Sequence, residues 1–299
     1  MFWNVENFFD WRNDSTTVSD AEFSSRGERH WTWKRFQAKA NAFAKALLWV
    51  EGKTGRLPDI VGLEEVENTF VLRQVLQKTL LRKLDYKYVH YDSPDRRGID
   101  VALLYRSSRL EPLDSKPCHL YAADTVMATR DILLCVFRFR KELDSTAFAV
   151  LVNHHPSKYG GAAESEPRRR IAVERLRFLA DSLAAIGIDR IIAGGDFNDT
   201  PDNPVFHLLE PSLMPTFVDL RRRGQGTIKY DGKWDLIDHI YVSPGWRASS
   251  SMRILRIPFL LTRDTAHSGE KPLRTYTGPR YTGGVSDHMP VLLEVPLPP

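Results

Sequence analysis

Two short motifs place acidic, amide and imidazole side chains directly beside apolar segments. The first, Gly195-Asp196-Phe197-Asn198, follows the apolar residues 191–193. The second, Ser286-Asp287-His288, precedes the apolar residues 291–295. Acids and a histidine at the ends of buried strands, beside glycine turns, are typical of a metal-assisted hydrolytic site rather than of a core. The sequence therefore indicates a class of reaction more clearly than a substrate.

Each of these polar side chains has a role that such a reaction needs. Asp196 can bind or deprotonate a water, and Asn198, two residues further on, can project with it and hold an anionic oxygen. Asp287 is a candidate metal ligand or an acid that supports a ligand, and His288 is a candidate base.

Another acid, Asp238, lies within the apolar residues 237–242. An unpaired carboxylate in such a strand is costly. A buried aspartate commonly pairs with an imidazole, fixing its tautomer and holding its charge. We therefore expect Asp238 to pair with His288, with the adjacent His239 as the competing partner.

The first predicted strand carries an amide and an acid that suit a hard cation. Asn4 and Glu6 are two residues apart, so on a regular strand they share one face. A carboxylate and an amide on one face can both reach a cation such as Mg²⁺. The alternative is a solvent-facing polar strip.

Three more acids, Glu64, Glu65 and Glu67, come at the end of the apolar residues 60–63. Strand alternation sends Glu65 and Glu67 to one side and Glu64 to the other. An acid aimed inward beside an apolar strand needs a cation or a hydrogen-bond donor. Oxygen ligands suit Mg²⁺, Mn²⁺ or Ca²⁺. The alternative is the start of a helix, where acids are common.

Two further candidates stand at strand ends. Asp100 precedes a predicted strand and either orients a histidine or is an ordinary loop acid. His154 follows the apolar residues 148–152 and can protonate a leaving group or stabilise developing charge. A lone histidine is more often structural, but Asn153 and His155 on either side favour the edge of a site.

The spacing of apolar residues predicts the elements that position these side chains. Steps of three and four residues recur in residues 33–48, in residues 72–80 and after Pro167, which predicts three amphipathic helices. The predicted strands are residues 60–63, 101–105, 132–139, 148–152, 191–193, 237–242 and 291–295. We predict one α/β (α+β) domain over residues 1–299, a sandwich of two packed sheets with helices outside. We expect residues 262–284 to form a long surface loop that delivers Asp287 and His288.

The composition is globular with a small basic excess. The 299 residues, 42% of them hydrophobic, are enough to bury a sizeable core. A net charge of +4 and a pI near 9.0 favour an anionic substrate but are too weak to establish nucleic-acid binding. The 2 cysteines neither require nor exclude a disulfide, and their spacing is not a zinc pattern. A monomer is favoured.

No apolar stretch approaches the ~20 residues needed to span a bilayer, so no transmembrane segment is predicted. The chain runs straight into its first predicted strand without a signal-peptide layout. Either the natural chain starts here and the protein is cytoplasmic, or a leader has been trimmed and the protein is exported. Trimming is favoured because a strand without lead-in residues is an awkward N-terminus. The localisation therefore stays open.

Taken in order, these motifs resemble the endonuclease/exonuclease/phosphatase superfamily, which includes pancreatic deoxyribonuclease, apurinic endonucleases, sphingomyelinases and inositol polyphosphate phosphatases. The resemblance runs from Trp3-Asn4 to Ser286-Asp287-His288. Its most specific parts are Glu65 after an apolar strand, Gly-Asp-Phe-Asn at 195–198, and the terminal Ser-Asp-His. It implies a four-layer sandwich with two central mixed sheets.

The resemblance also implies a divalent metal, usually Mg²⁺, with Mn²⁺ or Ca²⁺ as alternatives. The metal would be held chiefly by Glu65, with help from Asn4, Glu6 or Asp287. Glu64 departs from the pattern, since many members carry glutamine there. This change removes no required group but adds negative charge near the cation.

In the same way, the resemblance implies that Asp196 orients or deprotonates the attacking water while Asn198 holds the phosphate. His288, paired with Asp238, is then a base or a stabiliser of the transition state. His154 contacts the phosphate or serves as the acid. Members differ on whether the residue matching Asp196 or the one matching His288 takes the proton, so that assignment stays open.

Three further residues complete the implied site. Asp100 would orient His154, and Arg130 resembles a phosphate-facing basic position. Asn153 is a candidate substrate-binding residue beside His154.

The implied reaction is the metal-dependent hydrolysis of phosphate esters. The mild basic charge slightly favours a phosphodiesterase or endonuclease that acts on nucleic acid. The alternative is a phosphatase or phosphodiesterase that acts on small-molecule or lipid-headgroup phosphates. An inactive binding protein with the same fold is a further alternative, but Glu65, Asp196 and His288 are all retained.

Overall fold

The computed structural model describes residues 1–14, 17–140, 146–158, 161–249 and 251–295, and two sheets of six strands dominate it. The first sheet has the order β15 (Ser251–Ile254), β20 (Val291–Glu294), β1 (Phe2–Phe8), β2 (Ile60–Val66), β4 (Asp100–Arg106) and β3 (Tyr86–His90). The second has the order β11 (Met214–Pro215), β14 (Asp238–Val242), β10 (Arg190–Asp196), β9 (Phe148–His154), β8 (Ile132–Phe139) and β5 (Leu110–Cys118).

Each sheet contains one parallel pair of strands. β1 runs parallel to β2, and β9 runs parallel to β10. The other neighbours in the two sheets are antiparallel. Parallel strands end at the same edge of a sheet, so each pair delivers two carboxyl ends side by side. The prediction of mixed sheets is confirmed.

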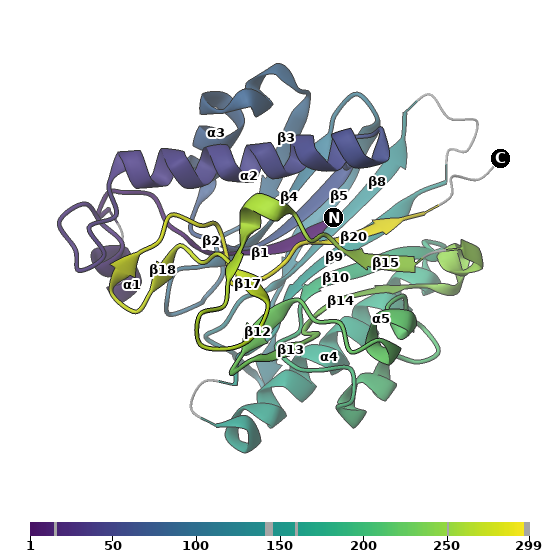
Figure 1. The fold of residues 1–299 in the computed structure, drawn as a ribbon. Coiled ribbons are helices and arrows are strands. Elements are labelled where there is room, and N and C mark those ends of the chain that lie inside the picture. The colour runs from purple at the N-terminus through teal and green to yellow at the C-terminus, as the bar shows by residue number, and fades with distance from the viewer. Residues whose placement is uncertain (15–16, 141–145, 159–160, 250, 296–299) are drawn as a thin grey trace.

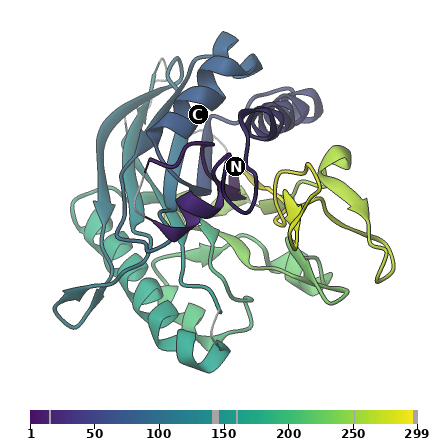
Figure 2. The same ribbon diagram turned by 90° about the vertical axis from the view of Figure 1, so that its left-hand side faces the viewer.

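Three long helices cover the outer faces of the sheets (Figures 1 and 2). α2 (Trp33–Thr54) and α3 (Thr69–Lys78) pack on the first sheet, and α4 (Ala162–Ala185) packs on the second. The short elements are α1 (Val18–Glu22), α5 (Val218–Arg222), β6 (Tyr121–Ala122), β7 (Thr125–Val126), β12 (Ile228–Tyr230), β13 (Lys233–Asp235), β16 (Leu261–Arg263), β17 (Glu270–Pro272), β18 (Tyr276–Thr277) and β19 (Arg280–Tyr281). This arrangement confirms the predicted four-layer sandwich.

Alternate residues of β1 fill the two interior layers. Trp3 points towards the helices and stacks on Phe43 of α2, with ring centroids 5.6 Å apart. Phe2 points between the sheets, where Gly62 and Gly194 lie against its ring. A Cβ at Gly62 would come within 2.3 Å of that ring, and one at Gly194 within 2.6 Å. Glycine at these two positions therefore lets the sheets close on Phe2.

The structure corrects three expectations about the elements. The helix predicted after Pro167 begins at Ala162, so the proline lies near its N-terminal end, where little helix precedes it. The predicted loop at residues 262–284 is interrupted by the hairpins β16–β17 and β18–β19. Strand β5 was not predicted because Pro112 and Pro117 interrupt it; it forms an edge of the second sheet, where proline is tolerated.

The structure also bears on membrane spanning and on the two cysteines. In the described part of the chain, no helix is both long and apolar enough to cross a membrane. Cys118 and Cys135 are both buried and free, so they form no disulfide.

Candidate active site

The candidate residues gather where the carboxyl ends of the two parallel pairs meet. β1 and β2 carry Asn4 and Glu65, whereas β9 and β10 carry His154 and Asp196. The Asn4 amide nitrogen donates a hydrogen bond of 3.0 Å to Oδ2 of Asp196. This bond joins the two sheets across the site.

Irregular backbone at these strand ends aims the side chains. The β1–β2 ladder shifts register between Asn4 and Phe8, and the β2–β4 ladder shifts between Glu64 and Val66. Positive φ angles occur at Glu6 (46°), Asn7 (51°), Glu65 (66°) and Asn198 (53°). A non-glycine residue in this region costs on the order of 1–3 kcal/mol, and such residues cluster at functional sites.

The bulge in β2 breaks the regular alternation of side chains between the two faces of the strand. Glu65 and Glu67 therefore have different partners. Glu65 accepts a hydrogen bond from the Asn7 N–H at 2.7 Å, whereas Glu67 accepts one from the Asp10 N–H at 2.7 Å. Glu64 is fully buried, and neither of its carboxylate oxygens has a hydrogen-bond partner among the described residues. Burial raises the pKa of Glu64 well above its usual value, and nearby carboxylates add to this effect. The surroundings of Glu64 therefore favour its protonated form.

Asp196 lies at the centre of the site. Three groups surround its Oδ2: Asn4 Nδ2 at 3.0 Å, His154 Nε2 at 3.7 Å and His288 Nε2 at 3.8 Å. The two imidazole distances are too long for direct hydrogen bonds. Burial raises the pKa of Asp196 to about 7, because the opposing attraction of His288 does not compensate for desolvation.

Asn198 is fixed directly beside Asp196. Its backbone N–H donates to Oδ1 of Asp196 at 2.8 Å, and its side-chain amide donates to the His155 carbonyl at 2.9 Å. The side chain is half-buried. The sequence-predicted pair of a carboxylate and an amide is therefore adjacent in space.

His288 is paired with Asp238, as the sequence predicted. Its Nδ1 lies 2.9 Å and 3.1 Å from the two carboxylate oxygens of Asp238. Burial opposes the imidazolium, but Asp238 and Asp196 outweigh it and raise the pKa of His288 well above its usual value. The competing His239 lies 3.2 Å from the Leu236 carbonyl instead. His288 therefore turns its Nε2 towards Asp196.

The His154 ring lies near both Asp196 and Glu65 without a direct hydrogen bond to either. Its Nε2 lies 3.7 Å from Asp196 Oδ2 and 3.9 Å from Glu65 Oε1. Its Nδ1 is buried and has no hydrogen-bond partner among the described residues. Burial lowers the pKa of His154 well below its usual value, and Arg130 and Arg97 lower it further. The ring is therefore neutral.

The expectation that Asp100 orients His154 is wrong. Asp100 Oδ2 lies 3.1 Å from His90 Nε2, and its Oδ1 accepts a hydrogen bond of 2.8 Å from the Ser93 N–H. The cause is the antiparallel pairing of β3 with β4, which brings His90 next to the start of β4.

Arg130 and Asn153 are both buried, and among the described residues Arg130 Nε and Asn153 Oδ1 have no hydrogen-bond partner, whereas their other polar atoms bond protein groups. The Arg130 guanidinium donates to Asp95 Oδ2 at 3.0 Å and to the His155 carbonyl at 2.7 Å. Asn153 is 0% exposed, and its amide donates to a carbonyl of its own strand at 2.9 Å. Side chains alternate along β9, so Asn153 and His154 face opposite sides of the sheet.

Glu65 is held by an arginine that the sequence reasoning missed. Arg97 donates to Glu65 Oε2 at 3.3 Å and to Asn7 Oδ1 at 2.6 Å. Burial raises the pKa of Glu65, but Arg97 and the Asn7 N–H outweigh it, so the net pKa is lowered and the side chain is ionised. Glu65 Oε1 accepts no hydrogen bond from any described residue and faces His154 at 3.9 Å.

A second missed arginine, Arg274, joins two of the predicted metal ligands. It contacts Glu6 Oε1 at 2.8 Å and Asp287 Oδ2 at 3.0 Å. The other Glu6 oxygen accepts a hydrogen bond of 3.0 Å from the Thr275 N–H. Burial and Asp287 together raise the pKa of Glu6 to about 7. Arg97 lies three residues before Asp100, beside a predicted site residue, whereas nothing in the sequence marks Arg274.

The donor set fits a hard divalent cation. Glu65 offers one ionised oxygen without a hydrogen-bond donor. Glu6 and Asp287 carry carboxylates that share Arg274, and Asn4 Oδ1 accepts a hydrogen bond of 2.9 Å from the Glu6 N–H. All are oxygen ligands of the kind that Mg²⁺ and Ca²⁺ prefer. Glu6, Glu65 and Asp287 do not form a compact three-acid group; the compact group at the site is Asp196, Asp238 and His288, whose ligand atoms lie within 4.8 Å of one another.

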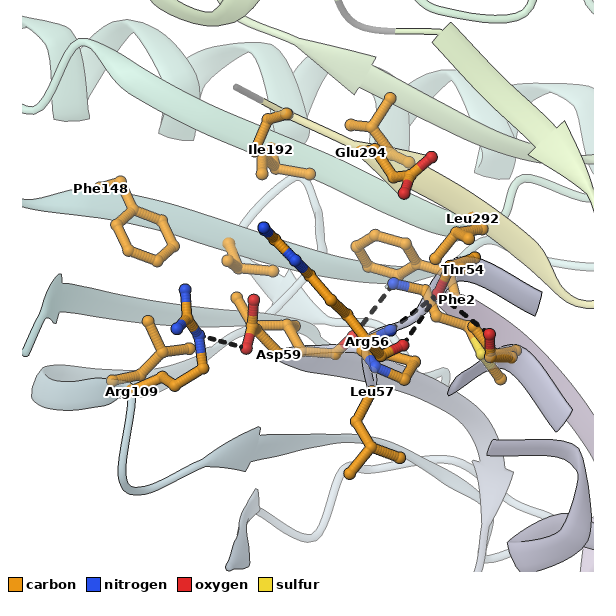
Figure 3. Close-up of a pocket in the computed structure, with 18 of the residues that line it drawn as sticks. Phe2, Thr54, Arg56, Leu57, Asp59, Arg109, Phe148, Ile192, Leu292 and Glu294 are labelled. Carbon is orange, nitrogen blue, oxygen red and sulfur yellow. Dashed lines mark hydrogen bonds and ion pairs between the residues drawn. The ribbon is translucent and has the colours of Figure 1, made fainter. Parts of the chain in front are cut away.

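A cavity with largely apolar walls, drawn in Figure 3, lies at the other end of the sandwich. It has a volume of about 180 Å³, and its walls include Phe2, Ile60, Phe148 and Ile192. These residues stand at or near the starts of β1, β2, β9 and β10. Arg56 extends into the cavity, and Arg109 is paired with Asp59 at its side. The titratable cluster at the opposite strand ends is therefore the candidate active site.

Comparison with known proteins agrees with this geometry. The sequence profile described as the Endonuclease/Exonuclease/phosphatase family matches residues 1–296. A curated relative, Protein angel of Drosophila melanogaster, is 26% identical over 215 residues, which are 67% of this chain and 58% of that protein. The chain thus spans less than two thirds of the length of that relative.

Solved structures with the same fold cover nearly the whole chain. The Bacteroides thetaiotaomicron mannosyl-6-phosphatase has a TM-score of 0.59 at 17% identity, covering 97% of this chain and 98% of that one. The human Nocturnin catalytic domain with a bound sulfate anion has a TM-score of 0.59 at 18% identity, covering 98% and 93%. D. rerio TDP2 complexed with a single-strand DNA product has a TM-score of 0.57 at 16% identity, covering 97% and 95%. Together with the whole-length profile match, these observations show that the chain belongs to the endonuclease/exonuclease/phosphatase family.

Proposed function

We propose that this chain, a single domain over residues 1–299, is a divalent-metal-dependent phosphodiesterase that acts on nucleic acid. The observation that carries the proposal is the surrounding of Asp196 Oδ2 by His154 Nε2 and His288 Nε2, at 3.7 Å and 3.8 Å. A carboxylate between two imidazoles supplies a proton acceptor and two groups for phosphate oxygens in one place. The membership of a family of phosphate-ester hydrolases supports the same reaction class.

The opposite pKa shifts of the two imidazoles suggest a division of labour. His288, charged through Asp238, stabilises the negative charge that develops on the phosphate. His154 is neutral and donates a hydrogen bond through Nε2 to a phosphate oxygen, without giving up its proton. Asp196, with a pKa raised to about 7, is the better acceptor for the proton of the attacking water. Asn198 positions Asp196 through its backbone N–H.

Glu65 is the residue best placed to hold the cation, with Asn4, Glu6 and Asp287 as further ligands. When bound, a divalent cation would neutralise phosphate charge and polarise the bond to phosphorus. Arg97 and Arg274 already form ion pairs with these acids. On metal binding, the arginines would have to move away or contact the acids together with the cation. Mg²⁺ is the proposed ion, because the donors are all hard oxygens.

The preference for nucleic acid is supported by charge. The chain has a net charge of +4, and the two guanidiniums at the site have exposed fractions of 43% for Arg97 and 49% for Arg274. A net positive charge attracts a polyanion over a long range.

A substrate panel tests the proposal. Supercoiled plasmid, a single-stranded oligonucleotide, inositol polyphosphates, sphingomyelin and simple phosphomonoesters would each be incubated with Mg²⁺, with Mn²⁺ and with chelator. We expect nicking of plasmid or cleavage of the oligonucleotide that stops with chelator. Release of phosphate from small phosphomonoesters alone would replace the nuclease proposal with a phosphatase, and no hydrolysis of any substrate would refute the enzyme proposal.

A further inference from the structure

A second group of acids lies away from the catalytic centre, where the loop after β1 meets the end of β2. One carboxylate oxygen each of Asp14, Asp20 and Glu67 lie within 4.8 Å of one another. Asp20 is 0% exposed and Glu67 is 7% exposed, whereas Asp14 reaches the surface. None of these residues takes part in the site described above. Figure 1 shows α1, which contains Asp20, at the end of the molecule towards which β1 runs.

The buried glutamate in this group lacks a positive partner. Glu67 Oε2 accepts a hydrogen bond of 2.7 Å from the Asp10 N–H. Its Oε1 is buried, and across the described ranges of the chain it has neither a hydrogen-bond donor nor an ion-pair partner. Burying an uncompensated carboxylate is costly, so this oxygen needs a cation or a proton.

The nearby arginine does not meet this need. Arg12 contacts Asp10 at 2.8 Å and Asp14 at 2.9 Å. It lies over the Phe70 ring, 3.8 Å from its centroid, and its side chain is 43% exposed. One guanidinium therefore pairs with Asp10 and Asp14 and makes no ion-pair contact with Glu67.

The geometry points to a cation with many oxygen ligands at long distances. We propose that Asp14, Asp20 and Glu67 bind a Ca²⁺ ion that is separate from the catalytic metal. Ca²⁺ takes oxygen ligands at about 2.3–2.6 Å, so two ligands on opposite sides of the ion lie about 5 Å apart. The observed group fits within that span. Mg²⁺ demands shorter distances and nearly ideal octahedral geometry, which three carboxylates from two separate segments meet less readily.

The ion would fasten the loop after β1 to the end of β2. Glu67 follows Glu65 by two residues, and the Asp10 N–H that bonds Glu67 follows Asn7 by three. Asn7 in turn donates its N–H to Glu65 at 2.7 Å. Ca²⁺ at the acid group would therefore restrain both segments that place Glu65, without contacting the substrate.

Calorimetry with CaCl₂ on the full chain tests this proposal in a Glu65→Gln background, which disables the catalytic metal ligand. We expect one Ca²⁺ to bind and to raise the melting temperature in Glu65→Gln protein. Adding Glu67→Gln should abolish both effects. Adding Asp14→Asn, a change at an exposed position that does not threaten folding, should weaken the Ca²⁺ affinity by about tenfold or more, as expected for loss of a charged ligand.

The matched control is Asp92→Asn in the same background, because Asp92 is the exposed member of another three-residue group, with His90 and Asp100. This control should leave Ca²⁺ binding unchanged. The proposal is overturned if Glu65→Gln protein binds no Ca²⁺, or if both Glu67→Gln and Asp14→Asn leave its affinity unchanged. Either result would mean that a proton, and not a cation, neutralises Glu67. Because none of these readouts is activity, they are independent of the proposed phosphodiesterase function.

Discussion

Replacing Asp238 by asparagine tests the charge that the site places behind His288. The two side chains have the same shape, so Asp238→Asn removes the negative charge while leaving an oxygen that can accept a hydrogen bond from Nδ1 of His288. In the present structure that nitrogen lies 2.9 Å from Asp238 Oδ2. The substitution therefore isolates electrostatics from packing.

The expected loss is large. Unit charges 2.9 Å apart attract by about 6 kcal/mol at an effective dielectric constant of ~20. The neutral hydrogen bond that replaces the pair returns about 1 kcal/mol. Half of the remaining difference of about 5 kcal/mol is about 2.5 kcal/mol, close to the roughly 2.7 kcal/mol that corresponds to a hundredfold change in rate. We therefore expect kcat to fall by about a hundredfold or more.

The assay is the initial rate of bis(p-nitrophenyl) phosphate hydrolysis at saturating Mg²⁺, with kcat and KM determined separately. The loss should appear in kcat, because His288 stabilises charge that develops only in the transition state. An NMR titration of His288 in the same variant should show its pKa moving down, since Asp238 is the strongest influence that raises it.

Asp131→Asn is the matched control. Asp131 contacts His119 Nδ1 with both oxygens at 2.9 Å, so it is a second buried aspartate with the same geometry, but its pair does not border Asp196. The kcat of Asp131→Asn should stay within about threefold of the wild-type value, because a substitution away from the reacting groups has only a small effect. If Asp238→Asn keeps more than a tenth of wild-type kcat, or if Asp131→Asn loses as much, the reasoning about His288 is refuted.

Three further predictions concern the acids around the site. Glu65→Gln should abolish activation by Mg²⁺ and lower turnover by about a hundredfold or more while keeping the fold, as checked by rate against Mg²⁺ concentration and by circular dichroism; unchanged Mg²⁺ activation would remove Glu65 from the metal site. Arg274→Gln should lower the free energy of unfolding in chelator by about 1–2 kcal/mol, because Glu6 and Asp287 lose their shared cation, and should tighten activation by Mg²⁺; weaker Mg²⁺ activation would contradict their role as ligands. In metal-free protein the pKa of Asp196 is raised from 3.8 to about 7, so its contribution to stability is full below about pH 4 and is lost as the pH rises through 7. The melting temperature of Asp196→Asn minus that of wild type should therefore be larger at pH 8 than at pH 5, and an equal difference at both pH values would contradict this.

Polar residues at strand ends mark the candidate site in the sequence more fully than apolar spacing marks the fold around it. Asp196, His154 and Glu65 were found because polar residues at the ends of buried strands are unusual, and parallel neighbours bring such ends together. The pairing of Asp238 with His288 followed from the cost of burying a carboxylate alone. These inferences need only local sequence and general energetics.

What could not be predicted depends on long-range contacts and on local backbone geometry. Arg274 reaches Glu6 across 268 residues of sequence, and no local pattern marks such a pair. The bulge at Glu65 breaks the period of two on which facing was predicted. Asp100 was assigned to the wrong histidine because the β3–β4 hairpin, which brings His90 to it, was not foreseen.

The central claim is that the groups converging on Asp196 hydrolyse phosphate esters with that carboxylate as the proton acceptor. The most direct test is the initial rate of phosphodiester hydrolysis by Asp196→Asn beside the wild type, at saturating Mg²⁺ and pH 8. The account predicts a rate lower by about a hundredfold or more, the usual contribution of a positioned general base. A rate within about threefold of wild type would contradict it, because a neutral amide cannot accept the proton.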